Sequence, residues 1–371
     1  MTKQSIRTWV WLHKWTSLVC TVFMLILGLT GLPLIFEHEI AHLTGADVEP
    51  AELPDELPAD HPRISLDRVM DIAIAQYPDK VGMFVSQDMD DDRVWYVTLS
   101  KAAHLEEGLK QVAVDARTGA VVAEPALEGG VMHFIESLHV DLFAGLPGMI
   151  FLGLMGFLLL IALVSGVVLY APFMRKLGFV EVRRHKEKST KWLDIHNALG
   201  IVTLVWFFVV GGTGVINAWG ELLFMNWQRT HLADMVAPYK GKAPLQQLGS
   251  LQAAVDSALA LEPNRTIQFI AFPGTGFSSP HHYGVFLRGS EPVTAHTSKP
   301  VLVDASTAQV TASENLPWYL TALQVSQPLH FRIQPGCPPP DAFPARGTAS
   351  PNLPLGNWGY SCIVPLRSRR C

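Results

Sequence analysis

The sequence predicts an integral membrane α-helical protein with three transmembrane helices and two extramembrane α+β modules, arranged as an internal duplication. Three observations predict this class. The chain of 371 residues contains three long apolar runs without Asp, Glu, Lys or Arg. Polar segments of similar strand pattern follow the first and third runs. The same motifs also recur in a constant register along the chain.

Each apolar run is long enough to cross a bilayer. Trp15–Phe36 has 22 residues, Leu142–Met174 has 33 and Ile195–Gly220 has 26, whereas a spanning helix needs about 20. We expect the second helix to be trimmed near Pro147-Gly148 and Ala171-Pro172, because proline interrupts a helix. No small-x-small cleavage site with a neutral mature start follows the first run, so we expect an uncleaved anchor rather than a signal peptide.

Lysine and arginine set the expected orientation. Lys3, Arg7 and Lys14 precede the first helix, and seven Lys or Arg residues lie between 175 and 191, whereas Glu37–Asp141 holds 22 acidic and 7 basic residues. Because basic loops stay on the cytoplasmic side, we expect a cytoplasmic amino terminus and two periplasmic modules. The basic run is short, adjoins the bilayer and lacks interleaved aromatic residues, so nothing indicates a nucleic-acid partner.

Both polar segments predict a helix followed by a small antiparallel sheet. Ser65 is a good N-cap before apolar residues at helical spacing, and Ser250 begins a similar helix in the second segment. Alternating or β-branched runs predict strands at 81–85, 94–99, 112–114 and 121–122 in the first module, and at 266–272, 282–287, 301–303 and near 310 in the second.

These elements divide the chain into seven segments. They are the cytoplasmic amino terminus with the first helix (1–36), the first periplasmic module (37–141), the second helix (142–174), a basic cytoplasmic loop (175–194), the third helix (195–220), the second periplasmic module (221–331) and a tail of different composition (332–371).

One register relates histidines in the two halves. His13 precedes Thr30-Gly31 by seventeen residues and His196 precedes Thr213-Gly214 by seventeen, so 196 − 13 and 213 − 30 both equal 183. Ionisable residues at membrane depth usually serve function, and imidazole is a good axial ligand for haem iron. The first and third helices run in the same direction, which places His13 and His196 together at the cytoplasmic-side depth.

A second histidine pair is expected at the outer face. Each polar segment closes on a Leu-His pair, which contains His139 in the first half and His330 in the second. The second helix enters the membrane from outside, so His139 lies at the outer face and His330 at the matching position before a fourth helix. Seventeen helical residues rise about 25 Å. Two b-type haems at these depths could carry electrons across the membrane.

Other residues are weaker candidates. His38 and His42 lie four residues apart on one helical face and could bind a metal or a haem, although we favour a polar cap where the first helix leaves the membrane. His133 is either an alternative ligand or an interfacial residue. Glycines in the apolar runs are typical of close helix packing or would leave room for a porphyrin. They are Gly28, Gly31, Gly211, Gly212 and Gly214.

Several cofactor and catalytic classes are not indicated. The chain has no CxxCH motif for a covalent c-type haem, no Walker motif, no GxGxxG after a strand, no nucleophile elbow and no HExxH. An electron donor would therefore be a separate, unidentified molecule.

Four motifs together resemble the PepSY-associated transmembrane family over roughly residues 5 to 331. They are Trp11-Leu12-His13-Lys14-Trp15, the run from Asp194 to Gly200, the phrase VDARTGAV at 114–121 and Ser137-Leu138-His139. The resemblance implies a bacterial inner-membrane protein with four helices, two periplasmic PepSY modules and two b-type haems. It also implies reduction of ferric siderophores, because the family includes ferric-siderophore reductases.

The chain departs from the family pattern after Phe331. Arg332–Cys371 contains eight Pro, five Arg and three Cys and no run of apolar residues that could span a bilayer. Out-of-frame translation and a genuine loss of the fourth helix both explain this change. We expect the tail to be disordered. Without a fourth helix, we expect His330 not to be held at a fixed depth, so that the chain binds one haem well and the second weakly or not at all.

Two other functions fit the same residues. The modules could be binding, inhibitory or sensory domains without redox activity, anchored by the helices. The chain could also be an inert fragment of a reductase. Haem content separates the redox function from the first alternative.

Overall fold

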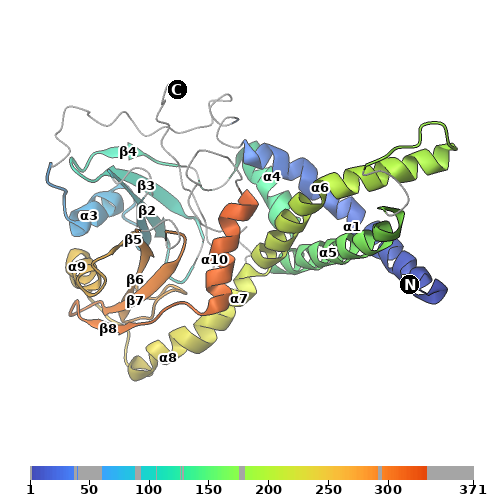
Figure 1. Ribbon diagram of the computed structural model, residues 1–371. Coiled ribbons are helices and arrows are strands. Elements are labelled where there is room, and N and C mark those ends of the chain that lie inside the picture. Colours follow the sequence, from blue (N-terminus) through green and yellow to red (C-terminus); the bar gives the residue numbers. More distant parts are fainter. Residues whose placement is uncertain are drawn as a thin grey trace.

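The computed structural model describes residues 2–36, 40, 61–87, 93–105, 107–125, 127, 129–174, 180–290 and 295–331. Three helices in this part of the chain are long and apolar enough to cross a membrane. They are α1 (Lys3–Ile35), α5 (Leu146–Met174) and α6 (Lys188–Ala218). They form a bundle at one end of the molecule, and an antiparallel sheet with its covering helices lies at the other end (Figure 1). The predicted combination of spanning helices and a sheet domain is therefore confirmed.

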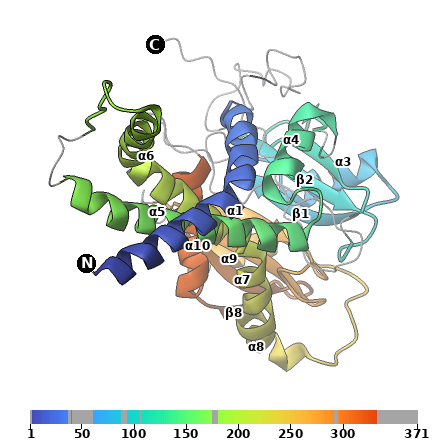
Figure 2. The ribbon, with the colours of Figure 1, turned by 90° about the vertical axis from the view of Figure 1, so that its right-hand side faces the viewer.

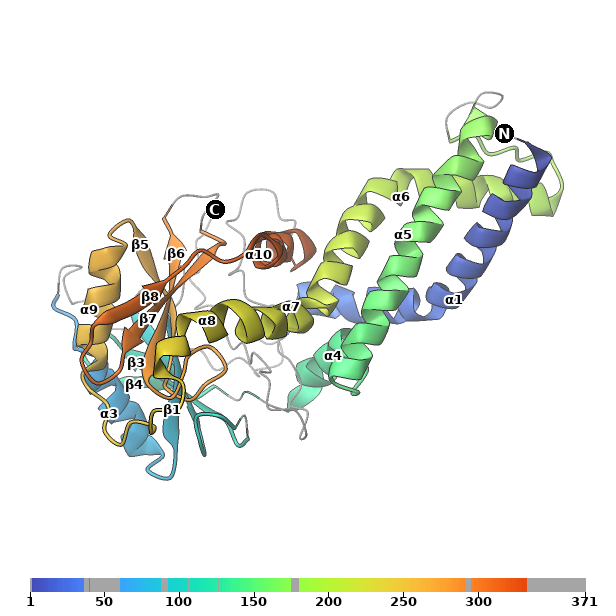
Figure 3. The same cartoon turned by 90° about the horizontal axis from the view of Figure 1, so that it is seen from below.

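Two of the spanning helices begin earlier than their apolar runs. Helix α1 begins at Lys3 and helix α6 at Lys188, because hydropathy marks the part of a helix that suits lipid and not its polar ends. His13 consequently lies well inside α1. The amino terminus and the described part of the connection before α6 lie at the end of the bundle that is far from the sheet (Figure 3). Seen along the long axis, the bundle stands in front of the sheet (Figure 2).

The segment before α5 is a separate helix, α4 (Gly130–Val140). His139 lies in its last turn, before the spanning helix α5 begins at Leu146. A tight turn follows, in which Leu142 and Phe143 adopt positive φ angles of 55° and 60°. The Asp141 side chain stabilises this turn by accepting a hydrogen bond from the Phe143 amide at 2.8 Å. The chain therefore changes direction two residues after the histidine.

The two predicted modules share one continuous eight-stranded antiparallel sheet in the order β4-β3-β2-β1-β5-β6-β7-β8. Strand β1 pairs with β5, with Val85 opposite Ile270, and this pairing joins the halves. The strands are β1 (Val81–Gln87), β2 (Val94–Ser100), β3 (Lys110–Asp115), β4 (Val121–Ala123), β5 (Arg265–Ala271), β6 (His282–Gly289), β7 (Ser298–Asp304) and β8 (Val310–Ser313). The strand positions agree with the predicted runs, but the sequence did not predict that the two sheets join.

Helices α3 (Leu66–Gln76) and α9 (Leu251–Leu261) cover one face of the sheet. Their apolar residues pack with the strands into one core, which includes the fully buried Val69, Val85 and Ile270. Both helices begin at the predicted serine N-caps, since Ser65 and Ser250 each accept a hydrogen bond from the amide three residues later.

The two covering helices also cap each other. Asp67 of α3 accepts a hydrogen bond from the Leu251 amide at 2.6 Å, and Gln252 of α9 accepts one from the Leu66 amide at 3.0 Å. Asp67 and Gln252 occupy the same position in their helices, two residues after the capping serine. Because the first amides of a helix lack partners within the helix, this exchange ties one module to the other.

Further helices cover the other face of the second half and connect the sheet to the bundle. Phe224, Trp227, Phe286 and Leu320 belong to this second core. Helix α10 contacts both α6 and α7. The elements are α7 (Gly220–Trp227), the π-helical turn η1 (Gln228–Leu232), α8 (Ala233–Met235), the 3₁₀ turn η2 (Ala237–Tyr239) and α10 (Trp318–Phe331).

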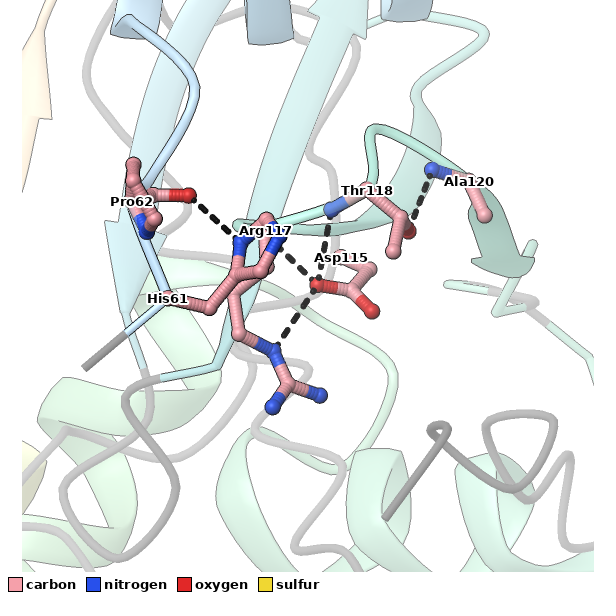
Figure 4. A network of polar contacts seen from close by, with 6 residues as sticks. All are labelled: His61, Pro62, Asp115, Arg117, Thr118 and Ala120. Carbon is pink, nitrogen blue, oxygen red and sulfur yellow. Dashed lines mark hydrogen bonds and ion pairs between the residues drawn. The ribbon is translucent and has the colours of Figure 1, made fainter. Parts of the chain in front are cut away.

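The repeated Val-Asp-Ala phrase builds the same turn in both modules. Asp115 accepts hydrogen bonds from the amides of Arg117 (2.7 Å) and Thr118 (3.4 Å), as Figure 4 shows. Asp304 accepts one from the Ser306 amide at 2.9 Å. An aspartate that bonds its own backbone two residues later favours a turn, which explains why this motif ends a strand in each half.

Candidate functional site

The four histidines that the sequence singled out come together as two pairs. The ring centres of His13 on α1 and His196 on α6 lie 6.2 Å apart, with an angle of 71° between the planes. Those of His139 on α4 and His330 on α10 lie 6.5 Å apart, at 51°. Each pair takes one histidine from each half of the chain. We call them the inner pair, at the end of the bundle far from the sheet, and the outer pair.

The spacing within each pair suits two ligands on opposite sides of one metal ion. A metal–imidazole bond is about 2 Å long, and the ring centre lies roughly 1 Å beyond the nitrogen, so two such rings have centres about 6 Å apart. In the described part of the chain, no group of three or more His, Cys, Asp or Glu residues could hold a metal ion. Two ligands alone fit a haem, because the porphyrin supplies the other four.

The first member of the outer pair is held against α1. Nδ1 of His139 lies 2.9 Å from Oγ1 of Thr30. A Cβ atom on Gly31 would lie 3.2 Å from Cε1 of this ring. Burial, and then the neighbouring His330, lower the pKa of His139 to about 4. The ring is therefore neutral at physiological pH.

The second member of the outer pair is held in the same way against α6. Nδ1 of His330 lies 3.1 Å from the Val210 carbonyl oxygen and 3.2 Å from Oγ1 of Thr213. The expectation that His330 needs a fourth helix to fix its position was wrong. Helix α10 packs on α6 before any such helix would begin, and it carries the ring with it.

The inner pair is supported on one side only. Nδ1 of His13 lies 2.9 Å from the Ala162 carbonyl oxygen and 3.1 Å from Oγ of Ser165, both on α5. His196 is exposed, and its ring makes no hydrogen bond to any residue that the structure describes. Helix α5 thus supports His13, whereas no described helix plays this part for His196.

An ion pair between the half-buried Arg183 and the buried Asp194 fixes the chain next to the inner pair. Asp194, two residues before His196, accepts hydrogen bonds from Nη2 of Arg183 at 2.8 Å and from Nε of Arg183 at 3.0 Å. The Arg183 amide donates to the same carboxylate at 3.0 Å. A bidentate arginine–carboxylate pair is geometrically specific, so it ties the basic loop to the first turns of α6.

Hydrogen bonding determines which ring nitrogen carries the proton and which keeps a lone pair for a metal. A carbonyl oxygen can only accept, so the contacts to Ala162 and Val210 require that Nδ1 of His13 and of His330 carries the proton. Nε2 then keeps its lone pair. Histidines that bind metals usually donate their other ring N–H to a carbonyl group or a similar acceptor. The two rings are therefore in the state that a metal ligand requires.

The remaining sequence candidates do not join these pairs. His133 lies on α4 with its Nδ1 4.0 Å from Oε2 of Glu136, and six helical residues turn it about 120° away from His139. His38, His42 and the tail 332–371 lie outside the described residues.

The glycines divide into three groups. Gly31 and Gly214 lie against the rings of the outer pair, where an added Cβ would come within 3.2 and 3.1 Å of Cε1. A Cβ on Gly211 would lie 3.1 Å from Leu159, which is helix packing as predicted. Gly28 and Gly212 have no neighbouring atom within 4 Å of such a Cβ.

Sequence reasoning missed the contribution of α5. Ala162, Ser165 and Gly166 surround the His13 ring, but a serine in an apolar helix does not stand out among titratable residues. A signal was present, because Ser165-Gly166 repeats the order of hydroxyl and glycine in Thr30-Gly31.

Comparison with known proteins agrees with the predicted family. A family model described as the PepSY-associated TM region matches residues 10–338. A protein of Pseudomonas aeruginosa described as uncharacterized is 33% identical over 98 residues, which are 26% of this chain and 23% of that protein. The match to a crystal structure of a lipoprotein from Clostridium difficile 630 spans 68% of this chain and 94% of the lipoprotein chain, at 9% sequence identity. Its TM-score of 0.28 is too low to support an argument. Because the family model spans most of the sequence, the chain belongs to the PepSY-associated transmembrane family.

Proposed function

We propose that this chain is a b-type haem protein of the bacterial inner membrane that passes electrons across the bilayer and reduces ferric chelates, such as ferric siderophores, in the periplasm. The observation that carries the proposal is the meeting of four histidines in two pairs, with ring centres 6.2 and 6.5 Å apart. The substrate class follows from the family and from the outward position expected for the sheet.

The residues fit haem binding at both sites. Haem would supply the one-electron chemistry of iron. His139 and His330 would hold it at the outer site, and His13 and His196 would hold it at the inner site. Because each site supplies two imidazoles, it would favour electron transfer over binding of oxygen or a chelate at the metal.

The depths of the two pairs support transfer along the bundle. His13 and Thr30 are both on α1, seventeen residues or about 25 Å apart, and Thr30 contacts the outer pair. The sheet lies beyond the outer pair and is tied to it through α7 and α10 (Figure 1). A ferric chelate that docks on the sheet side would therefore meet the outer site, while a separate donor would reduce the inner one.

A vesicle assay tests this function. The purified protein is reconstituted into liposomes that enclose dithionite, and ferric citrate with a chromogenic ferrous chelator is added outside. We expect ferrous iron to form faster than in protein-free liposomes, and we expect His13→Ala or His139→Ala to abolish the increase. A haem-free protein, or variants as active as the native chain, would contradict the proposal and favour a non-redox binding protein.

A further inference from the structure

Three of the four histidines are held by the same short sequence step. Thr30-Gly31 contacts His139, Thr213-Gly214 contacts His330, and Ser165-Gly166 contacts His13. In each case a hydroxyl residue directly precedes a glycine on a neighbouring helix. Nδ1 of the ring approaches the hydroxyl, and Cε1 approaches the glycine. The step occurs on three different helices, α1, α5 and α6.

Each hydroxyl faces its ring as an acceptor. Oγ1 of Thr30 donates its proton to the Ile26 carbonyl oxygen at 2.8 Å, and Oγ1 of Thr213 donates to that of Val209 at 2.7 Å. Oγ of Ser165 likewise donates within its own helix, to Ala162 at 3.0 Å. Because the hydroxyl proton is already used, the oxygen lone pair remains for the ring N–H.

Each glycine lets the ring edge lie close to the helix backbone. A Cβ at Gly31, Gly166 or Gly214 would come 3.2, 3.1 and 3.1 Å from Cε1 of the respective ring, which is closer than ordinary van der Waals contact. The close approach also brings Nδ1 within reach of a backbone carbonyl, at 2.9 Å for His13 and 3.1 Å for His330. The hydroxyl and the glycine therefore act together to set the position of one ring.

We propose that these hydroxyl–glycine steps are positioning elements. They fix the Nδ1–H tautomer of the ligand histidines and strengthen Nε2 as an electron-pair donor to iron. The inference rests on the proposed haem function, since it assigns Nε2 to iron. When a neighbouring group accepts a hydrogen bond from Nδ1–H, the imidazole becomes more basic and binds a metal more strongly through Nε2. It thereby favours ferric over ferrous iron.

Isosteric variants of Thr30 test the hydroxyl. Thr30→Val keeps the shape and removes the acceptor, whereas Thr30→Ser keeps the acceptor. We expect Thr30→Val to shift the midpoint potential of the outer haem to more positive values and to weaken haem binding about tenfold. We expect Thr30→Ser to restore both. The matched control is Thr21→Val, because Thr21 is exposed, bonds only to Ser17 of its own helix and lies on the opposite face of α1.

Alanine variants on α6 test the glycine. Gly214→Ala would push the His330 ring away from its carbonyl and hydroxyl partners, so we expect the spectrum of the outer haem to change. Gly212→Ala is the matched control, because a Cβ there meets nothing within 4 Å.

A measurement on haem-free protein separates this inference from the proposed function. ¹⁵N NMR of histidine-labelled protein reports the tautomer, and the His139 signal is assigned by its loss in His139→Gln. We expect the proton on Nδ1 of His139 in the native chain, whether or not haem binds. A proton on Nε2 would overturn the inference. An unchanged midpoint potential in Thr30→Val, or an equal shift in Thr30→Ser, would also overturn it. Native protein that takes up no haem would instead contradict the proposed function.

Discussion

The two halves of the chain support their histidines alike at the outer end of the bundle and differently at the inner end. His139 of the first half rests on α1, and His330 of the second half rests on the matching step of α6. At the inner end, His13 rests on α5 of its own half, whereas His196 has no hydrogen-bonding partner for its ring among the described residues.

This difference shows that the three supported rings are each held by a neighbouring helix and not by their own. Both rings of the outer pair are supported, because α4 and α10 lie within the two halves and do not depend on a spanning helix that comes after them. The inner pair depends on a spanning helix after each module. Among the described residues, only the first half supplies such a helix, α5. The outer site is therefore the better supported of the two, which reverses the order expected from the sequence. The number of haems in the chain stays a prediction.

The largest expected effect is the loss of the outer haem. His139→Ala and His330→Ala should each abolish the same low-spin b-haem absorption, and the double variant should match either single one, because both rings would bind one iron in the proposed site. Pyridine haemochrome assays of the purified variants measure this loss. His133→Ala, which changes another face of α4, is the control and should retain the signal. If either single variant kept the full spectrum, the pairing would be wrong.

The turn between α4 and α5 should also be needed for the outer site. A Cβ on Gly148 would lie 1.8 Å from the Asp141 carbonyl oxygen, and a backbone atom cannot move aside cheaply. We expect Gly148→Ala to cost about 3 kcal/mol and to lower outer haem content while the inner haem remains. Thermal unfolding and haem content in detergent measure these effects, with Gly212→Ala as control. Unchanged haem content at both sites would show that the turn does not position His139.

Haem release should distinguish the two pairs. Because His196 lacks a hydrogen bond to its ring, we expect the inner haem to transfer to excess apomyoglobin about tenfold faster than the outer haem. The slow phase should disappear in His139→Ala. A single phase, or loss of the fast phase in that variant, would contradict the assigned order.

The smallest effect is expected where the modules cap each other. Asp67→Ala should destabilise the sheet by about 1 kcal/mol. Gln252→Ala should cost less, because a carboxylate accepts a stronger hydrogen bond than an amide. Thermal unfolding followed by circular dichroism compares the two variants. Equal losses would mean that the charge of Asp67 adds nothing to the exchange.

Local patterns in the sequence predicted much of this fold. The serine caps at Ser65 and Ser250 and the strand runs are local signals, and they correspond to the observed helices and strands. The pairing of β1 with β5 was not predictable, because it joins residues such as Val85 and Ile270 that are far apart in the chain. Single-sequence patterns carry no information on such a contact.

The candidate site was predictable for its titratable residues only. The register of His13 and His196 indicated a pair, and their rings do meet. The partners of the rings were missed, since Ser165 and Ala162 act through a hydroxyl and a backbone carbonyl in an apolar helix. The position of His330 was misjudged, because the packing of α10 on α6 is a tertiary contact.

The central claim is that the four histidines form two bis-imidazole haem sites. Low-temperature electron paramagnetic resonance of the oxidised, detergent-purified protein tests it most directly when the haem content is counted in the same sample. We predict low-spin ferric signals typical of two imidazole ligands, with the outer site filled. Protein without haem, or haem with a high-spin signal from a single histidine ligand at the outer site, would contradict the account.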